Sequence, residues 1–262
     1  MTVLEAILLG IVQGVTEFLP VSSSGHLVLA ETILRVPTPG VFIEVALHVA
    51  TLLSVAVVYR RRLAALLAGA ARREPDALRF LGLLALATLP AGLVGLTLRE
   101  PIERIFHSPA LVGTTLLLTG TLLWSTRWAP RRPGRDHLTW SAALLIGTAQ
   151  ALAILPGISR SGATIAAALW AGLRAERAAE FSFLLALPAI AGAALLEAPD
   201  LAASLQQTGT AAMAAGFAAA LVTGIASIVF LVWLLRRSAF PAFAFYLWAV
   251  GGLTLLYLWL GG

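Results

Sequence analysis

The sequence contains neither cysteine nor lysine, and only 12% of its 262 residues are charged. The lack of cysteine excludes disulfides and thiolate metal sites. The scarcity of charge, together with 59% hydrophobic residues, excludes an ordinary soluble domain, in which about a quarter of the residues are charged. Apolar residues form continuous runs and do not alternate, so a transmembrane β-barrel is disfavoured. The composition is that of a polytopic α-helical membrane protein.

All 18 basic residues are therefore arginines, and the formal net charge is +5. A basic protein can bind nucleic acid, but these arginines form clusters between apolar segments, as in the cytoplasmic loops of membrane proteins. We expect the lipid bilayer, and no nucleic acid, as a partner. The two main clusters are Arg60, Arg61, Arg62, Arg72, Arg73 and Arg79, and Arg127, Arg131, Arg132 and Arg135.

Six apolar runs are long enough to cross a bilayer, whose hydrocarbon core is about 30 Å thick. Two other apolar stretches, 3–36 and 138–173, are interrupted by Pro, Gly and Ser at 20–25 and 156–162. The arm after each interruption has about 12 residues, or about 18 Å of helix, which is too short to cross. Both stretches are predicted to be re-entrant helical hairpins. The predicted transmembrane helices are residues 41–59, 78–98, 110–126, 178–196, 211–235 and 240–260.

This arrangement places 14 of the 18 arginines on one side of the membrane, which the positive-inside rule makes cytoplasmic. Arg35, Arg99 and Arg104 lie on the opposite side. Both termini and the mouth of the first hairpin then face outward, and the second hairpin enters from the cytoplasm.

The two hairpins also align without gaps at an offset of 137 residues. Because they enter from opposite sides, the match indicates an inverted-topology repeat, in which two broken elements meet to form a site. The predicted fold is all-α, with one integral membrane domain over 1–262 and repeat halves at about 1–130 and 138–262. The matching residues include Gln13, Ser22, Ser24 and Gly25, which recur as Gln150, Ser159, Ser161 and Gly162.

The interrupted tips of the two hairpins are the predicted functional site. Non-helical backbone at membrane depth is tolerated only against protein or a water-filled cavity, and each tip leads into a helix N-terminus, which favours anions. Arg160 in the second tip suits phosphate oxygens through its planar guanidinium, although an internal ion pair with Glu17 is an alternative. Helix capping is the alternative for the serines and glycines. The candidate substrate-binding residues are Ser22, Ser24, Gly25, Ser161, Gly162 and Thr164.

Gln13 and Glu17 are four residues apart, so they share one helix face that leads toward the first tip. Glu17 is a candidate ligand for Mg²⁺ or Ca²⁺, because Mg²⁺ is usually held by one or two carboxylates together with substrate phosphates. Gln13 offers only a neutral carbonyl. The alternative role of Glu17 is that of a structural partner of Arg160, and both roles can coexist.

His26 lies in the first turn after the first tip, where an imidazole can take a proton from a serine or a water, or protonate a leaving phosphate. A buried structural histidine is the alternative. Ser23 is the first choice of nucleophile, with His26 as its base, and attack by Ser159 or directly by water stays open. For Glu44 and His48, also four residues apart, a hydrogen-bonded pair facing the bundle interior is favoured over catalysis.

Two long motifs resemble those of one known family. They are Gly-x-x-Gln-Gly-x-Thr-Glu-Phe-Leu-Pro-Val-Ser-Ser-Ser-Gly-His at 10–26 and Pro-Gly-x-Ser-Arg-Ser-Gly-Ala-Thr at 156–164. In order and spacing the chain resembles the undecaprenyl-diphosphate phosphatases, the bacitracin-resistance membrane phosphatases. The resemblance implies hydrolysis of undecaprenyl diphosphate to undecaprenyl phosphate and inorganic phosphate, which recycles the lipid carrier for cell-wall synthesis. It also implies Mg²⁺ or Ca²⁺ as cofactor, and a site open to the outer face of the bacterial cytoplasmic membrane.

The resemblance covers nearly the whole chain, with one departure at Gln13, where the family often has Glu. This departure leaves one charge fewer for a metal ion. Inverted repeats with broken helices are also common in transporters, so a transporter or flippase of a lipid phosphate is the alternative function. A homodimer is one option that the sequence leaves open. The family active-site positions correspond to Glu17, Ser23, His26, Ser159, Arg160 and Thr164.

Overall fold

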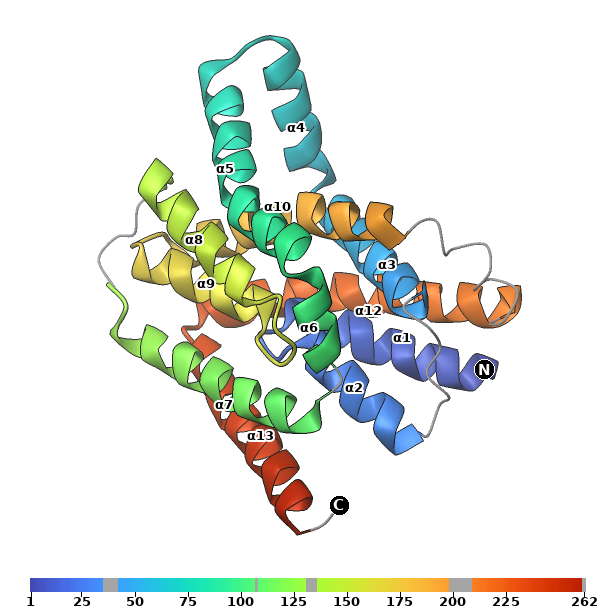
Figure 1. Ribbon diagram of the computed structural model, residues 1–262. Coiled ribbons are helices and arrows are strands. Elements are labelled where there is room, and N and C mark those ends of the chain that lie inside the picture. Colours follow the sequence, from blue (N-terminus) through green and yellow to red (C-terminus); the bar gives the residue numbers. More distant parts are fainter. Residues whose placement is uncertain (35–41, 107, 131–135, 198–208, 261–262) are drawn as a thin grey trace.

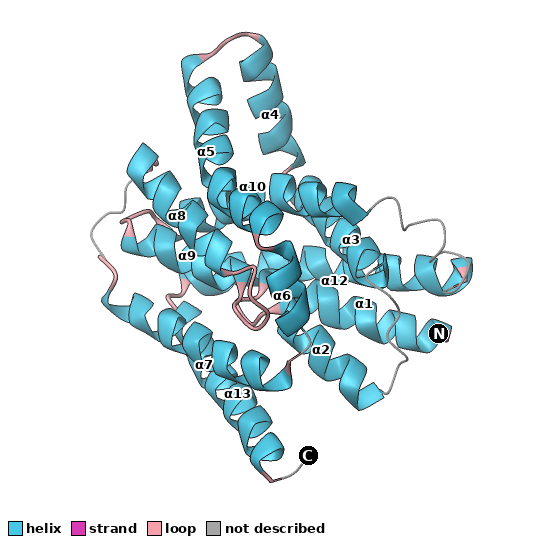
Figure 2. Cartoon of the chain, viewed as in Figure 1, coloured by secondary structure: helices cyan, strands magenta, loops and turns pink. Residues whose placement is uncertain are grey.

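A computed structural model of the chain describes residues 1–34, 42–106, 108–130, 136–197 and 209–260. These residues form helices joined by turns, with no strand among them (Figures 1 and 2). The all-α prediction is therefore confirmed for the described part of the chain. In chain order the helices are α1 (Val3–Phe18), α2 (Ser23–Leu34), α3 (Phe42–Val58), α4 (Arg60–Ala71), α5 (Pro75–Thr97), α6 (Arg99–Phe106), α7 (Pro109–Ser125), η1 (Thr126–Trp128), α8 (Trp140–Leu152), α9 (Arg160–Trp170), α10 (Ala175–Glu197), α12 (Thr210–Arg236), η3 (Phe240–Ala242) and α13 (Phe243–Trp259).

Each of the six predicted spans coincides with a helix, namely α3, α5, α7, α10, α12 or α13. By length and composition, four helices in the described residues can cross a membrane: Pro75–Thr97, Ala175–Leu195, Thr210–Arg236 and Phe240–Trp259. The pair formed by α6 and α7, which is bent by 97°, gives a fifth candidate. The chain is thus a multi-pass membrane protein.

Two segments that were predicted as connections are helical. The loop expected at 60–77 contains α4, and the connection after α5 contains α6. The sequence of α4 is made almost entirely of Arg, Leu and Ala, which are among the strongest helix formers. Local propensity therefore produces a helix where the pattern of apolar runs indicated only a loop.

The first helix of each hairpin packs against a long helix from the other half of the chain, α1 against α12 and α8 against α5. Both contacts rely on glycine. A Cβ atom on Gly10 would collide with the carbonyl oxygen of Gly216 in α12, and one on Gly147 would collide with that of Ala87 in α5. Small residues let membrane helices approach this closely, and Gly10 and Gly147 are themselves separated by the repeat offset.

The arginine-bearing loops that were predicted to share one side do lie together. Arg79 Nη2 donates to the carbonyl oxygen of Leu138, 3.0 Å away. Of the predicted loop arginines, Arg131, Arg132 and Arg135 lie outside the described residues, as does Arg35 on the opposite side. Further ion pairs link the same loops and the adjoining helix ends, between Arg62 and Glu180 (2.7 Å), Arg174 and Asp136 (3.5 Å), and Arg236 and Glu176 (3.6 Å).

Candidate active site

The interrupted tips of the two hairpins are in contact, as the sequence predicted. Ser161 Oγ at the start of α9 donates to the carbonyl oxygen of Leu19 at the end of α1, 3.1 Å away. A Cβ atom on Gly25 would lie 3.3 Å from the Cα atom of Gly157. Ser22 turns the first tip with φ of +71° and Gly157 turns the second with φ of +86°, a left-handed conformation that is uncommon for a residue other than glycine.

Two threonines of α7 hold the second tip, and the sequence analysis did not single them out. Thr115 Oγ1 donates to the carbonyl oxygen of Pro156 at 2.6 Å, and Thr119 Oγ1 donates to that of Gly157 at 3.0 Å. These bonds satisfy carbonyls that a broken helix leaves without partners. The sequence signal that could have found them is two hydroxyls four residues apart in an apolar span.

Glu17, which is buried, and Arg160, which is partly buried, form an ion pair across the two tips. Arg160 Nη2 lies 2.5 Å from Glu17 Oε1, and the side chains are 19% and 5% exposed. The alternative weighed for each residue, an internal ion pair, is therefore present in the structure. An arginine has five N–H donors, and the described residues place only this carboxylate against Arg160.

The second carboxylate oxygen of Glu17 gathers three more side chains. Glu17 Oε2 accepts hydrogen bonds from Ser23 Oγ at 2.5 Å and Gln13 Nε2 at 2.9 Å, and His48 Nε2 lies 3.6 Å away. His48 was expected to pair with Glu44, whose side chain lies outside the described residues. That pairing stays a prediction, and the structure places His48 beside the predicted catalytic carboxylate.

His26 lies close to the tips but does not contact Ser23. Its Nδ1 atom is 2.8 Å from the carbonyl oxygen of Ser22, and its Nε2 atom is 2.7 Å from the hydroxyl of Tyr246, against whose ring it stacks. A carbonyl can only accept, so Nδ1 carries the proton and Nε2 accepts from Tyr246. The predicted pairing of Ser23 with His26 is not formed, because Glu17 accepts the Ser23 hydrogen bond.

A cavity of about 780 Å³ opens beside the ion pair. Glu17 and Arg160 face each other on its wall, so an anion entering the cavity would meet both. The other predicted residues that line it are Ser22, Ser23, Ser24 and Ser159.

The remaining predicted site residues serve hydrogen bonds within the protein. Ser159 Oγ caps α9 by accepting from the backbone N–H of Gly162 at 3.0 Å. Thr164 Oγ1 donates to the carbonyl oxygen of Arg160 at 2.7 Å and lies 2.6 Å from Ser182 Oγ. Of these residues only Ser159 also lines the cavity, whereas Gly25, Ser161, Gly162 and Thr164 shape the tips and do not line it.

The donor set for a divalent cation is small. The described residues contain no group of three or more His, Asp or Glu side chains that could hold a metal ion. Gln13 turns its amide nitrogen toward Glu17, and its buried oxygen Oε1 has no hydrogen-bond partner. Among the side chains that the structure describes, Glu17 is the one carboxylate on the cavity wall, which fits a cation that is held mainly by phosphate oxygens.

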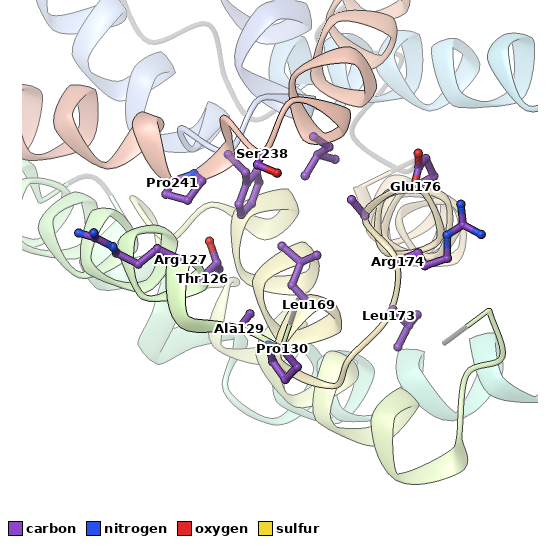
Figure 3. A pocket seen from close by; sticks show the side chains of 13 residues that line it. Thr126, Arg127, Ala129, Pro130, Leu169, Leu173, Arg174, Glu176, Ser238 and Pro241 are labelled. Atoms are coloured by element: carbon purple, nitrogen blue, oxygen red, sulfur yellow. The ribbon is translucent and has the colours of Figure 1, made fainter. Parts of the chain in front are cut away.

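A second cavity, of about 450 Å³, lies among the arginine-bearing loops and holds none of the predicted site residues (Figure 3). Arg127 of η1 and Arg174 and Glu176 at the start of α10 line it, with Ser238 and Pro241 from the segment after α12. It is separate from the site at the hairpin tips.

Comparison with known proteins identifies a family for the whole chain. Residues 6–253 match the family model described as bacitracin resistance protein BacA. The chain is 43% identical to the undecaprenyl-diphosphatase of Alcanivorax borkumensis over 260 residues, which cover 97% of this chain and 98% of that protein. It is 41% identical to the undecaprenyl-diphosphatase of Moorella thermoacetica over 262 residues, 99% of each chain.

Proposed function

Because the chain belongs to the bacitracin resistance protein BacA family, we propose that it is a membrane phosphatase that hydrolyses undecaprenyl diphosphate to undecaprenyl phosphate and inorganic phosphate. The relatives named undecaprenyl-diphosphatase cover nearly the whole chain. The structural observation that carries the proposal is the contact of Glu17 with both Ser23 and Arg160 on a cavity wall. This contact joins a proton acceptor, a nucleophile and a phosphate-binding cation.

Ser23 attacks the terminal phosphorus, and Glu17 takes its proton, since the Ser23 hydroxyl already donates to the Glu17 carboxylate. The bond between that phosphorus and the bridging oxygen breaks, and undecaprenyl phosphate leaves with its proton supplied from Glu17. A water molecule then attacks the phosphorus of the phosphoserine with Glu17 again as base, the bond between phosphorus and Ser23 Oγ breaks, inorganic phosphate leaves, and Glu17 returns the proton to Ser23 Oγ. This assignment replaces His26 as the base, and it leaves His26 to hold the carbonyl of Ser22.

Electrostatic stabilisation comes from Arg160 and from two helix ends. The guanidinium keeps further N–H donors for phosphate oxygens, and α2 and α9 both begin at the cavity wall, at Ser23 and Arg160. Positive helix N-termini favour the charge that develops on a transferring phosphoryl group.

For Mg²⁺ or Ca²⁺ we propose Glu17 as the protein ligand, with Gln13 orienting its carboxylate through the Nε2 bond. A bound divalent cation would neutralise charge on the diphosphate. Chelation should lower hydrolysis, and excess Mg²⁺ or Ca²⁺ should restore it.

The deciding experiment is phosphate release from undecaprenyl diphosphate by detergent-purified protein with Mg²⁺ and Ca²⁺ supplied. We expect equal amounts of inorganic phosphate and undecaprenyl phosphate without any membrane gradient. The alternative of a transporter or flippase is not favoured by the relatives' names. Intact substrate in this assay, with folded protein, would favour transport and contradict the proposal.

We also propose that α3, α5, α7, α10, α12 and α13 cross the bacterial cytoplasmic membrane, with two re-entrant hairpins in an inverted repeat and the active site open outward. The contact of α1 with α12 is matched by the contact of α8 with α5, and this correspondence supports the repeat. The absence of native cysteine permits a direct test with single-cysteine variants. A membrane-impermeant maleimide added outside cells should label Thr2→Cys, and Arg73→Cys only after the cells are opened.

A further inference from the structure

The cavity beside Glu17 and Arg160 extends well beyond the residues that take part in the proposed hydrolysis. From Glu17 and Arg160 it continues between α5, α6 and α10. Its walls there are apolar, and they include Leu96, Ile102 and Phe106 from α5 and α6, and Ile190 from α10. This apolar extension is called the groove below.

Three glycines of α5 and α10 line the groove, namely Gly92, Gly95 and Gly192. A Cβ atom on any of them would meet no atom within 4 Å. They differ in this from Gly10, which close helix packing requires. Helix stability does not favour these glycines, because glycine weakens a helix. Their local effect is that no side chain at these positions fills the groove.

One polar side chain on the same cavity has no partner. Gln150 near the end of α8 lines the cavity and is 2% exposed, and neither its Nε2 nor its Oε1 atom has a hydrogen-bond partner. A buried amide left in this state is costly. Oxygen atoms of a bound ligand would accept a hydrogen bond from its Nε2 donor.

We propose that the groove between α5 and α10 binds the isoprenoid tail of the substrate, while Gln150 Nε2 donates a hydrogen bond to a diphosphate oxygen. The inference rests on the proposed function. The occupant follows from continuity, because one cavity joins the apolar walls to Glu17 and Arg160. Gly92 is exposed on α5, next to the exposed Leu93, so the groove reaches the outer surface of the helix bundle. A tail can therefore enter sideways from the bilayer.

The test substitutes leucine for each groove glycine in the full chain and compares two substrates. Gly92→Leu, Gly95→Leu and Gly192→Leu fill space that is open in the structure, and leucine favours helix more than glycine does. We expect kcat/KM for undecaprenyl diphosphate to fall by about tenfold or more, with kcat/KM for the short-chain geranyl diphosphate changed by less than about threefold. Gly252→Leu in α13 is the matched control, since its Cβ also meets nothing within 4 Å but it lies outside the cavity.

Gln150→Leu distinguishes binding of the diphosphate from binding of the tail. Loss of a diphosphate contact should lower kcat/KM for both substrates by a similar factor. Unchanged kcat/KM for undecaprenyl diphosphate in the glycine variants would overturn the proposal that the groove binds the tail. An equal loss on both substrates would do the same, since it would locate the effect at the phosphate. Failure of the unaltered protein to hydrolyse either substrate would contradict the proposed function instead.

Discussion

Arg160 and Glu17 are 143 residues apart in the sequence, and Arg160 Nη2 lies 2.5 Å from Glu17 Oε1. Each comes from the interrupted tip, or the helix leading to it, of a different hairpin. An unpaired arginine at bilayer depth is expensive, so the ion pair stabilises the contact of the two hairpins before substrate arrives. The same two groups then stand on the cavity wall, where a diphosphate can share them.

Glu17→Gln should lower kcat by about 10²-fold or more, because general-base catalysis typically contributes 10² to 10⁴. Phosphate release from undecaprenyl diphosphate measures the effect. The matched control is Glu180→Gln, which removes a carboxylate that is also paired with arginines but lies off the cavity. A comparable loss in both variants would mean that charge removal acts through folding and not through catalysis.

Arg160→Ala should nearly abolish activity in protein that elutes as folded. Retention of more than about a tenth of kcat would mean that Arg160 contributes under about 1.4 kcal/mol to the transition state, too little for its proposed role. Arg160→Lys keeps the charge but loses the planar fork, and we expect it to recover only part of the activity. Full recovery by lysine would show that charge alone is needed.

Ser23→Ala and Ser159→Ala distinguish the two candidate nucleophiles. Ser23→Ala should reduce kcat by about 10³-fold or more if the covalent route operates. Ser159→Ala removes the cap of α9 and should cost about 1 kcal/mol of stability, visible as a lower melting temperature, with a smaller loss of kcat. The reverse order of the two kcat values would assign the attack to Ser159.

Tyr246→Phe tests the role of His26. Its hydroxyl is the Nε2 partner of His26, and the net worth of one such hydrogen bond is about 1 kcal/mol. If His26 only holds the first tip, kcat/KM should fall by no more than about fivefold, with an unchanged pH profile. A shift of the acidic or alkaline limb of the pH profile of kcat/KM in this variant would show that His26 acts as an acid or a base.

Thr115→Val should destabilise the protein by about 1–3 kcal/mol, because it leaves the buried carbonyl oxygen of Pro156 without its donor. Thermal unfolding in detergent measures the change. Thr114→Val is the control on the same helix, since the exposed Thr114 bonds only within its own turn, to Ala110. Equal melting temperatures for the two variants would show that the second tip does not depend on α7.

The helices and the tips were predictable because their signals are local. An apolar run of sufficient length predicts each long helix, and the Pro, Gly and Ser clusters after Leu19 and Leu155 mark the interruptions. The repeat offset also pairs Ser23 with Arg160 and Glu17 with Ile154. From this alone it follows that one hairpin supplies the carboxylate and the other the guanidinium.

The partners of individual side chains were less predictable. His48 faces Glu17, and His26 faces Tyr246, a residue 220 positions away. Thr115 and Thr119 hold the second tip from α7. Spacing along the chain says which residues share a helix face, but it does not say which neighbouring helix that face meets.

The sequence by itself determined that this protein belongs in a membrane, where its long apolar helices are and which two segments are interrupted, because hydrophobicity and helix interruption act over a few neighbouring residues. The tertiary structure alone decided that Glu17, and not His26, accepts the Ser23 hydrogen bond, and that the cavity continues between α5 and α10. Those outcomes depend on how distant helices rotate and pack against one another, and hydrogen bonds of a few ångströms are sensitive to that rotation.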